Sequence, residues 1–204
     1  MSMRSLSDAP ASAEVSAVAG ALPHHPALAG TERLEIEHFI YDVFARRFDA
    51  CVPVFMPELV ARRDACGRVV AAAGIRVADE PLYLEQYLDA PVECCIERLT
   101  GQRPARAQVA EVGQLAAASA GEGQRMIVEL AFRLTDRRIE WVVATLTREL
   151  RQRFVRMGIR PLLLNEADPG RLRGGSSDWG RYYEHNPVVL AGHLPSAMSR
   201  LQGV

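Results

Sequence analysis

Apolar side chains recur at helical spacing in three stretches of the chain, residues 34–48, 124–135 and 148–157. Within residues 124–135 they form one continuous apolar face. Thr147 precedes the third stretch as an N-cap residue, and Gly158 follows it as a stop signal. The pattern therefore predicts three helices with these boundaries.

Between the helices lie short segments that are typical of β-strands. Residues 51–62 and 68–78 flank a turn at residues 64–67 and are predicted to form a hairpin. The remaining predictions are strands at residues 106–115, 139–145, 161–164 and 187–191, a loop at 116–123, and a helix at 81–99 that Pro91 interrupts. This order predicts an α/β fold in which helix 124–135 crosses over between two neighbouring strands of one sheet.

The first 30 residues are rich in Ala, Ser and Pro and show no periodicity, which predicts a disordered tail before one domain at residues 31–204. No signal peptide is expected, because Asp8, Pro10 and Glu14 interrupt the weakly apolar region there. The longest strongly apolar stretch, residues 69–75, is far below the roughly 20 residues that span a bilayer. These features predict a cytoplasmic protein without a membrane segment.

The four cysteines show no C-x-x-C spacing and are predicted to be buried reduced thiols rather than zinc ligands. The histidines share no ligand spacing either, so no metal site is expected.

Every one of the 24 basic side chains is an arginine. The absence of lysine excludes a Schiff-base mechanism and a nucleotidase that uses a phosphate-loop lysine. Residues 31–97 hold 13 acidic and 7 basic residues, whereas residues 98–160 hold 6 acidic and 12 basic residues. This asymmetry reflects either solvated helix faces or a basic face that binds a polyanionic donor.

Glycines follow the predicted strand 106–115 and precede helix 124–135. Gly121 and Gly123 allow close approach of a ligand to the backbone, and a helix N-terminus offers unpaired N–H groups. We therefore expect phosphates of a donor to bind at Ala120, Gly121, Glu122, Gly123, Gln124 and Arg125. A plain strand-to-helix turn is the alternative, and a dinucleotide fingerprint is incomplete because Met126 replaces its third glycine.

Residues 118–123 resemble the Q/R-x-x-G-x-G/A signature of the GNAT acyltransferase superfamily, with alanine in place of its first residue. Residues 154–159 resemble that superfamily's Y-x-x-x-G-F segment, with Phe154 replacing the tyrosine that often protonates the departing thiolate. Five further blocks, at residues 55–59, 74–76, 84–89, 111–116 and 179–184, look like the thermostable hemolysin family, although Gln114 stands where that family is expected to carry Asn.

These resemblances imply a GNAT-like domain of the α/β (α+β) class, with a mixed, mostly antiparallel sheet flanked by helices. The architecture is similar to that of acyl-homoserine-lactone synthases, in which a glutamate at the position of Glu111 lies near the reacting amine. Gly113 is expected to leave room for a ligand beside Glu111, and Val112 is expected to contact the donor. Further catalytic candidates are Tyr183 and Glu85, and Tyr182 is the alternative to Tyr183 for the acid missing at Phe154. Candidates for acceptor binding are Arg76, Gln86, Tyr87, Asp89 and Trp179.

The predicted function is transfer of an acyl group from a thioester or similar activated carrier to a small-molecule amine. The donor is a co-substrate rather than a tightly bound cofactor: acyl-CoA, phosphopantetheine on an acyl carrier protein, or an aminoacyl-tRNA. Two alternatives remain open. One is a secreted cytolysin, as the family name implies, and the other is a ligand-binding domain without catalysis.

Overall fold

The computed structural model describes residues 26–201. Helix α1 (Pro26–Phe48) begins earlier than the predicted residue 34, and its last turns carry the expected apolar face, with Ile40 and Phe44 buried. Most of the predicted tail lies outside the described residues.

Six strands form one sheet in the order β1-β2-β3-β4-β6-β5. All neighbouring pairs are antiparallel except β3 and β4, which are parallel. The strands are β1 (Glu58–Arg63), β2 (Val69–Val77), β3 (Val109–Ala117), β4 (Trp141–Leu146), β5 (Leu162–Glu166) and β6 (Val188–His193). Helix α3 (Ala120–Asp136) connects β3 to β4, which confirms the predicted crossover.

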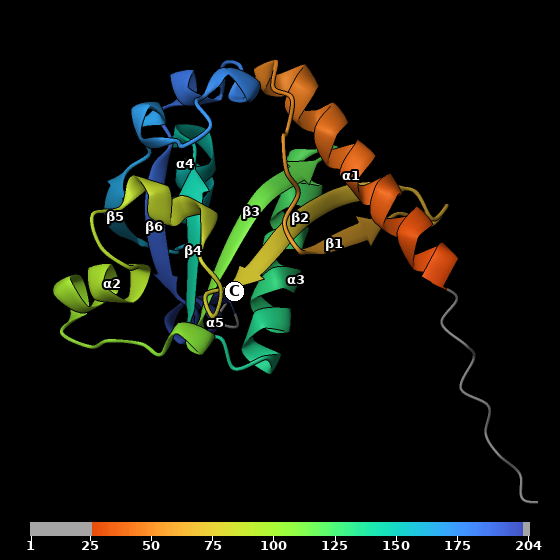
Figure 1. The fold of residues 1–204 in the computed structure, drawn as a ribbon. Helices are drawn as coiled ribbons and strands as arrows, with labels where there is room; N and C mark the ends of the chain where they lie inside the picture. Colours follow the sequence, from red (N-terminus) through yellow and green to blue (C-terminus); the bar gives the residue numbers. More distant parts are fainter. Residues whose placement is uncertain (1–25, 202–204) are drawn as a thin grey trace, which may run out of the picture.

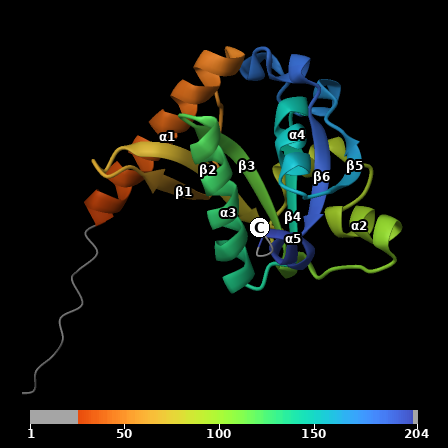
Figure 2. The same cartoon turned by 180° about the vertical axis from the view of Figure 1, so that it is seen from behind.

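Helices cover both faces of the sheet (Figures 1 and 2). One face carries α3, α4 (Arg148–Arg156) and α5 (Leu194–Leu201), with Ala110 and Leu130 among its buried contacts. The other face carries α1, the 3₁₀ helix η1 (Tyr83–Tyr87), α2 (Val92–Thr100) and residues 177–185. We call the first the α3 face and the second the α1 face.

Three predicted boundaries are wrong. Residues 51–57 are not a strand: they cross the sheet as an extended strap, whose polar backbone groups bond to side chains. The stretch at residues 81–99 divides into η1 and α2 because Pro91 cannot continue a helix. The predicted loop at 116–123 is reduced to two residues, because β3 runs to Ala117 and α3 begins at Ala120.

The thiol prediction is also wrong in part, since Cys51 and Cys66 are exposed and only Cys95 is fully buried. By contrast, the predicted caps are confirmed. The Thr147 side chain accepts a hydrogen bond from the Leu150 N–H, and Gly158 ends the helix with a φ of 75°.

Candidate functional site

The parallel strands β3 and β4 separate part-way along their length. Their pairing ends at Glu111 and Val143, although β3 continues to Ala117 and β4 to Leu146. Gln114 has a φ of 54°, and the pairing of β3 with β2 shifts register at this point. The irregularity turns β3 away from β4 and opens a gap through the sheet.

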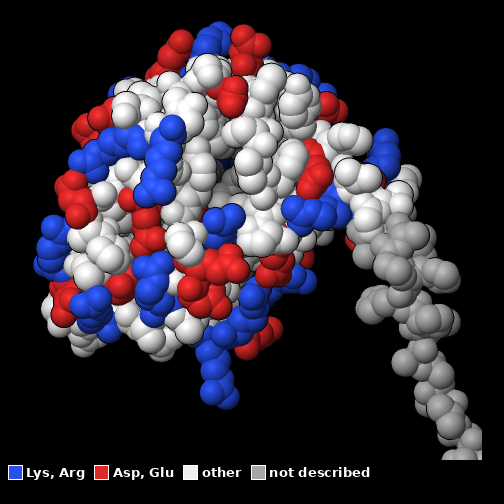
Figure 3. Space-filling view, viewed as in Figure 1, with Lys and Arg blue, Asp and Glu red and all other residues white. Residues whose placement is uncertain are grey.

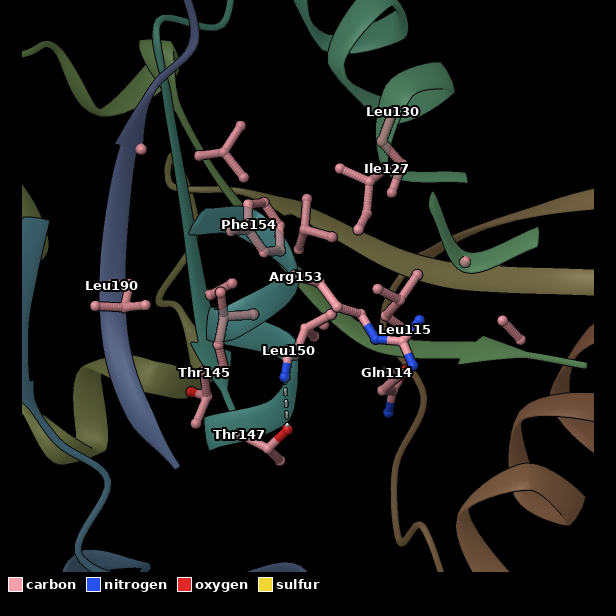
Figure 4. A pocket seen from close by; sticks show the side chains of 18 of the residues that line it. Gln114, Leu115, Ile127, Leu130, Thr145, Thr147, Leu150, Arg153, Phe154 and Leu190 are labelled. Atoms are coloured by element: carbon pink, nitrogen blue, oxygen red, sulfur yellow. Dashed lines mark hydrogen bonds between the residues drawn. The ribbon is translucent and has the colours of Figure 1, made fainter. Parts of the chain in front are cut away.

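A cavity of about 390 Å³ fills this gap and extends over the α3 face. Its wall is mainly aliphatic. In Figure 4, Ile127 and Leu130 extend from α3 towards Leu150 and Phe154 of α4. Other apolar side chains that line the cavity are Leu134, Val142, Leu146, Ile159, Pro161, Leu190 and Leu194. A cavity with such a wall favours an apolar ligand over water.

One end of the cavity is polar and lies at the start of α3. The Ser119 side chain caps this helix by accepting from the Glu122 N–H, and the first intrahelical bond runs from Gly123 N–H to Ser119 O at 3.1 Å. The N–H groups of Ala120 and Gly121 precede that bond, so they have no acceptor within the helix. Arg153 lines the same end and donates to Ala120 O at 3.5 Å.

Some of the residues that were predicted to bind the donor line the cavity, and others do not. Val112, Ala120 and Gly123 line the cavity. Gly121, Glu122, Gln124 and Arg125 belong to the same stretch of α3 but are not among the residues that line it. The Glu122 carboxylate is paired with Arg62 and Arg125.

Glu111 lies on the α1 face and is only 3% exposed. Its carboxylate accepts hydrogen bonds from the backbone N–H groups of Tyr83 at 2.7 Å and Leu84 at 3.2 Å. Burial raises the pKa of Glu111 to about 7, although these two donors and the charge of Arg76 act in the opposite direction. A carboxyl group with this pKa exchanges a proton readily near neutral pH.

Gly113 lines the cavity, but the space that it leaves on the side of a Cβ atom is filled. Gly113 pairs with Gly74 across β2 and β3, and the Met56 side chain lies over both. A Cβ atom on Gly113 would lie 2.5 Å from the terminal methyl carbon of Met56. The Gln114 amide holds the strap in place, since it accepts from Met56 N–H at 3.1 Å and donates to Val54 O at 2.7 Å.

Glu85 belongs to an ion-pair network that is separate from the cavity. Its carboxylate accepts from Arg106 at 2.8 Å and also from the backbone N–H groups of Leu82 and Val92. Burial of Glu85 favours its neutral form, but these hydrogen bonds outweigh burial and leave its pKa below the ordinary value. Arg106 also bonds Glu93, so the network fixes η1 and α2 in the position that presents the Tyr83 N–H to Glu111.

Aromatic side chains gather near Glu111 on the α1 face. The Trp179 indole N–H donates to the Tyr83 hydroxyl at 3.1 Å, and the hydroxyls of Tyr87 and Tyr183 lie 2.6 Å apart. Burial raises the pKa of Tyr183 to about 12. The structure thus brings the predicted residues Trp179, Tyr87 and Tyr183 together.

Gln86 and Asp89 lie at the outer side of η1 and fasten it to a neighbouring loop. The Gln86 side chain accepts from Arg173 N–H at 3.1 Å, and Asp89 forms an ion pair with Arg171 at 2.5 Å. Neither side chain lines the large cavity.

Sequence reasoning named Tyr182 only as an alternative to Tyr183 for the acid missing at Phe154, and it missed other residues of the cavity. Tyr182 lines it and donates from its hydroxyl to Thr145 O at 3.1 Å, which places the phenol at the gap between β3 and β4. Arg47, at the end of α1, lines it as well. The aromatic pair at residues 182–183 was the only signal for Tyr182, and nothing local in the sequence connects Arg47 with α3.

The structure was also compared with the requirements of a metal site and of a membrane-crossing helix. No group of three or more His, Cys, Asp or Glu side chains within residues 26–201 is arranged to hold a metal ion. In the same part of the chain, no helix combines the length and apolar character that crossing a bilayer requires.

Comparisons with solved structures reveal the same fold in acyl-transferring synthases. TofI in an apo form is 17% identical, with a TM-score of 0.58, over 90% of this chain and 93% of TofI. The AHL synthase LasI is 13% identical, with a TM-score of 0.55, over 84% of this chain and 89% of LasI. FeeM, an N-acyl amino acid synthase from uncultured soil microbes, is 13% identical, with a TM-score of 0.54, over 84% and 96%. At these identities the likeness establishes the fold, which is GNAT-like.

A search of curated protein sequences finds no match. The family model for thermostable hemolysin matches residues 28–198, which is most of the domain predicted from the sequence. The chain therefore belongs to the thermostable hemolysin family and has the fold of the acyl-homoserine-lactone synthases.

Proposed function

We propose that this protein transfers an acyl group from a thioester donor to an amine. One observation carries the proposal: a single apolar cavity joins the N-terminus of α3 to the gap between β3 and β4, beside the strand that bears Glu111. A ligand with phosphates at one end and an apolar acyl chain at the other matches this arrangement.

The donor's phosphates bind at the polar end. The free N–H groups of Ala120 and Gly121 and the positive end of the α3 dipole favour an anion. Arg153 and Arg47 add positive charge at the cavity wall, and Arg47 is partly neutralised by its ion pair with Glu149. CoA and carrier-bound phosphopantetheine both present this chemistry.

The acyl chain occupies the aliphatic part of the cavity. A methylene takes up roughly the volume of one water molecule, ~30 Å³, so a space of this size holds a chain of several carbons as well as part of the thiol arm. Each buried methylene contributes about 0.8 kcal/mol, so affinity rises about fourfold per added methylene until the cavity is full.

The reaction begins when the amine nitrogen attacks the thioester carbonyl carbon in the gap. Backbone groups of the separated strands stabilise the developing oxyanion. Glu111 takes the proton from the amine, directly or through one water molecule, since each carboxylate oxygen keeps a second lone pair beyond its backbone N–H bond. The C–S bond then breaks, and the departing thiolate takes a proton from the Tyr182 hydroxyl, whose position at Thr145 O suits it better than Tyr183.

Calorimetric titration with free CoA and with acetyl-, butanoyl-, hexanoyl- and octanoyl-CoA tests the donor part of this proposal. The affinity should increase along the series. Gly192→Val should weaken binding of the longest donor only. Gly192 lines the cavity, and a Cβ atom added to it would lie 3.8 Å from Val142 O, so the valine side chain fits and takes up cavity space.

Gly174→Val is the matched control, since Gly174 is exposed and has no atom within 4 Å of an added Cβ. It should leave the whole series unchanged. Absence of binding by every donor, including CoA, would contradict the proposed function.

A further inference from the structure

Arg76 lies directly opposite Glu111 in the antiparallel pair of β2 and β3. Directly opposed residues project from the same face of a sheet, so the two side chains share the α1 face. The Arg76 charge lowers the pKa of Glu111, but no ion pair within 4.0 Å joins Arg76 to any acidic side chain of residues 26–201. Glu111 and Arg76 are therefore neighbours without being a bonded pair.

The Arg76 guanidinium is only partly satisfied. Its Nη1 donates to Pro81 O at 3.1 Å, whereas its Nε is buried and has no hydrogen-bond partner. Within residues 26–201 only one other buried side-chain nitrogen, Nε of Arg151, shares this condition. Buried donors without an acceptor are rare, and each such case calls for an explanation.

The nearby carboxylates are engaged with other donors and form no hydrogen bond with it. The two oxygens of Glu111 accept from the Tyr83 and Leu84 N–H groups. Glu85 is bound to Arg106. Arg76 thus supplies an uncompensated positive charge beside the carboxyl group that the proposed function assigns to the amine. Figure 3 shows this face hollowed near its middle, with basic side-chain atoms at the edge of the hollow.

We propose that the acyl acceptor is an α-amino acid whose carboxylate binds to Arg76 while its amine faces Glu111. This inference rests on the proposed function and specifies its acceptor. Because Nη1 donates to Pro81 O, the guanidinium edge formed by Nε and Nη2 remains for a ligand. The N–H groups of that edge are spaced to donate to both oxygens of a carboxylate. Because Nε is buried, binding includes a rotation of the flexible Arg76 side chain.

The spacing of the two residues suits such a ligand. Opposed residues of an antiparallel pair have Cβ atoms about 4.5–5.5 Å apart. An α-amino acid carries its amine and carboxylate on one carbon, so one molecule reaches both side chains. A simple amine would leave the Arg76 charge without a counter-ion, and a bulky polyanion would not reach Glu111.

Matched acceptor pairs test the inference with octanoyl-CoA as donor. The pairs are L-phenylalanine with 2-phenylethylamine and L-leucine with isoamylamine, which differ only in the carboxylate. The wild-type protein should show a higher kcat/KM with the amino acid of each pair. Arg76→Gln should lower that value by about ten- to hundredfold, the range for a hydrogen bond to a charged group, and should change the amine value much less, since the simple amine has no carboxylate to lose.

Arg76→Lys should retain part of the preference, because it keeps the charge but loses the bidentate edge. Arg68→Gln is the control, since Arg68 is exposed and pairs only with Asp64. Equal kcat/KM for both members of each pair, or an equal loss for both in Arg76→Gln, overturns the inference and leaves the proposed function standing. Transfer to none of the four acceptors overturns both.

Discussion

The Glu111 carboxylate accepts a hydrogen bond of 2.7 Å from the backbone N–H of Tyr83, which joins the first half of β3 to the start of η1. The Glu111 carboxyl group has two properties that suit proton transfer. The carboxyl group is buried and has a pKa of about 7, yet two backbone donors hold it in a fixed orientation. Its proton is therefore both exchangeable near neutral pH and well placed.

The raised pKa predicts a specific dependence of stability on pH. The unfolded chain releases the Glu111 proton near the ordinary value of 4.5, whereas the folded chain retains it up to about pH 7. Between these values the folded state binds more protons, so this group's contribution to the free energy of unfolding falls as pH rises from 4.5 to 7 and is constant above that. The total change is on the order of 3 kcal/mol or less.

Urea unfolding of the wild type and Glu111→Gln at a series of pH values measures this change. The difference in unfolding free energy between the two proteins should vary between pH 4.5 and 7 and stay constant outside that window. A difference that is independent of pH would mean that Glu111 ionises with an ordinary pKa.

Gly121→Ala should stabilise the protein and weaken donor binding. Gly121 lies in the first turn of α3 with an ordinary φ and open space at the position of a Cβ, so alanine fits and gains helix propensity of about 0.5–1 kcal/mol. The added methyl group would crowd a phosphate at the N–H groups. Thermal unfolding and calorimetry with CoA measure the two effects.

Gly30→Ala is the control, because Gly30 is an exposed position of α1 with nothing near an added Cβ. It should raise the unfolding temperature similarly without changing CoA affinity. If Gly121→Ala binds CoA as tightly as Gly30→Ala, the phosphates do not lie at the start of α3.

The two adjacent tyrosines should differ in their effect on turnover. Tyr182→Phe removes the hydroxyl at Thr145 O in the gap and should lower kcat about a hundredfold, with a stability loss of about 1 kcal/mol. Tyr183→Phe removes only the contact with the Tyr87 hydroxyl and should leave kcat within a fewfold of the wild type. Comparison of kcat at saturating donor decides between them. The reverse ranking would assign the proton to Tyr183.

The family name leads to a separate prediction. The proposed reaction consumes an acyl donor and an amine and does not itself open a membrane. Purified monodisperse protein at micromolar concentration should therefore release no haemoglobin from red cells when acyl donors and amines are absent. Saturable lysis under these conditions would favour the cytolysin.

The sequence predicted the elements whose signals are local. The apolar stripe of α3, the Thr147 cap and the Gly158 stop each depend on a few neighbouring residues, and all three are confirmed. The crossover of α3 between adjacent strands followed from the order of elements. These features arise from backbone chemistry that a single segment contains.

Features that depend on distant contacts were not predictable. Gly113 suggested room for a ligand, but Gly113 and Gly74 accommodate Met56 from a strap that lies far away in sequence. Residues 51–57 have strand-like composition, yet they do not pair with a strand. Backbone groups of this segment form hydrogen bonds with the side chains of Gln114 and Arg33 instead. The sequence offers Glu85 as a catalytic candidate but gives no sign that its carboxylate is bound to Arg106, which lies 21 residues away.

Acyl transfer is tested by incubating the protein with octanoyl-CoA and L-phenylalanine and following the products by mass spectrometry. N-octanoyl-phenylalanine and free CoA should form in equal amounts, with a rate about a hundredfold lower for Glu111→Gln. Release of CoA without the amide product, or an unchanged rate in Glu111→Gln, would contradict the central claim that Glu111 serves acyl transfer to an amine.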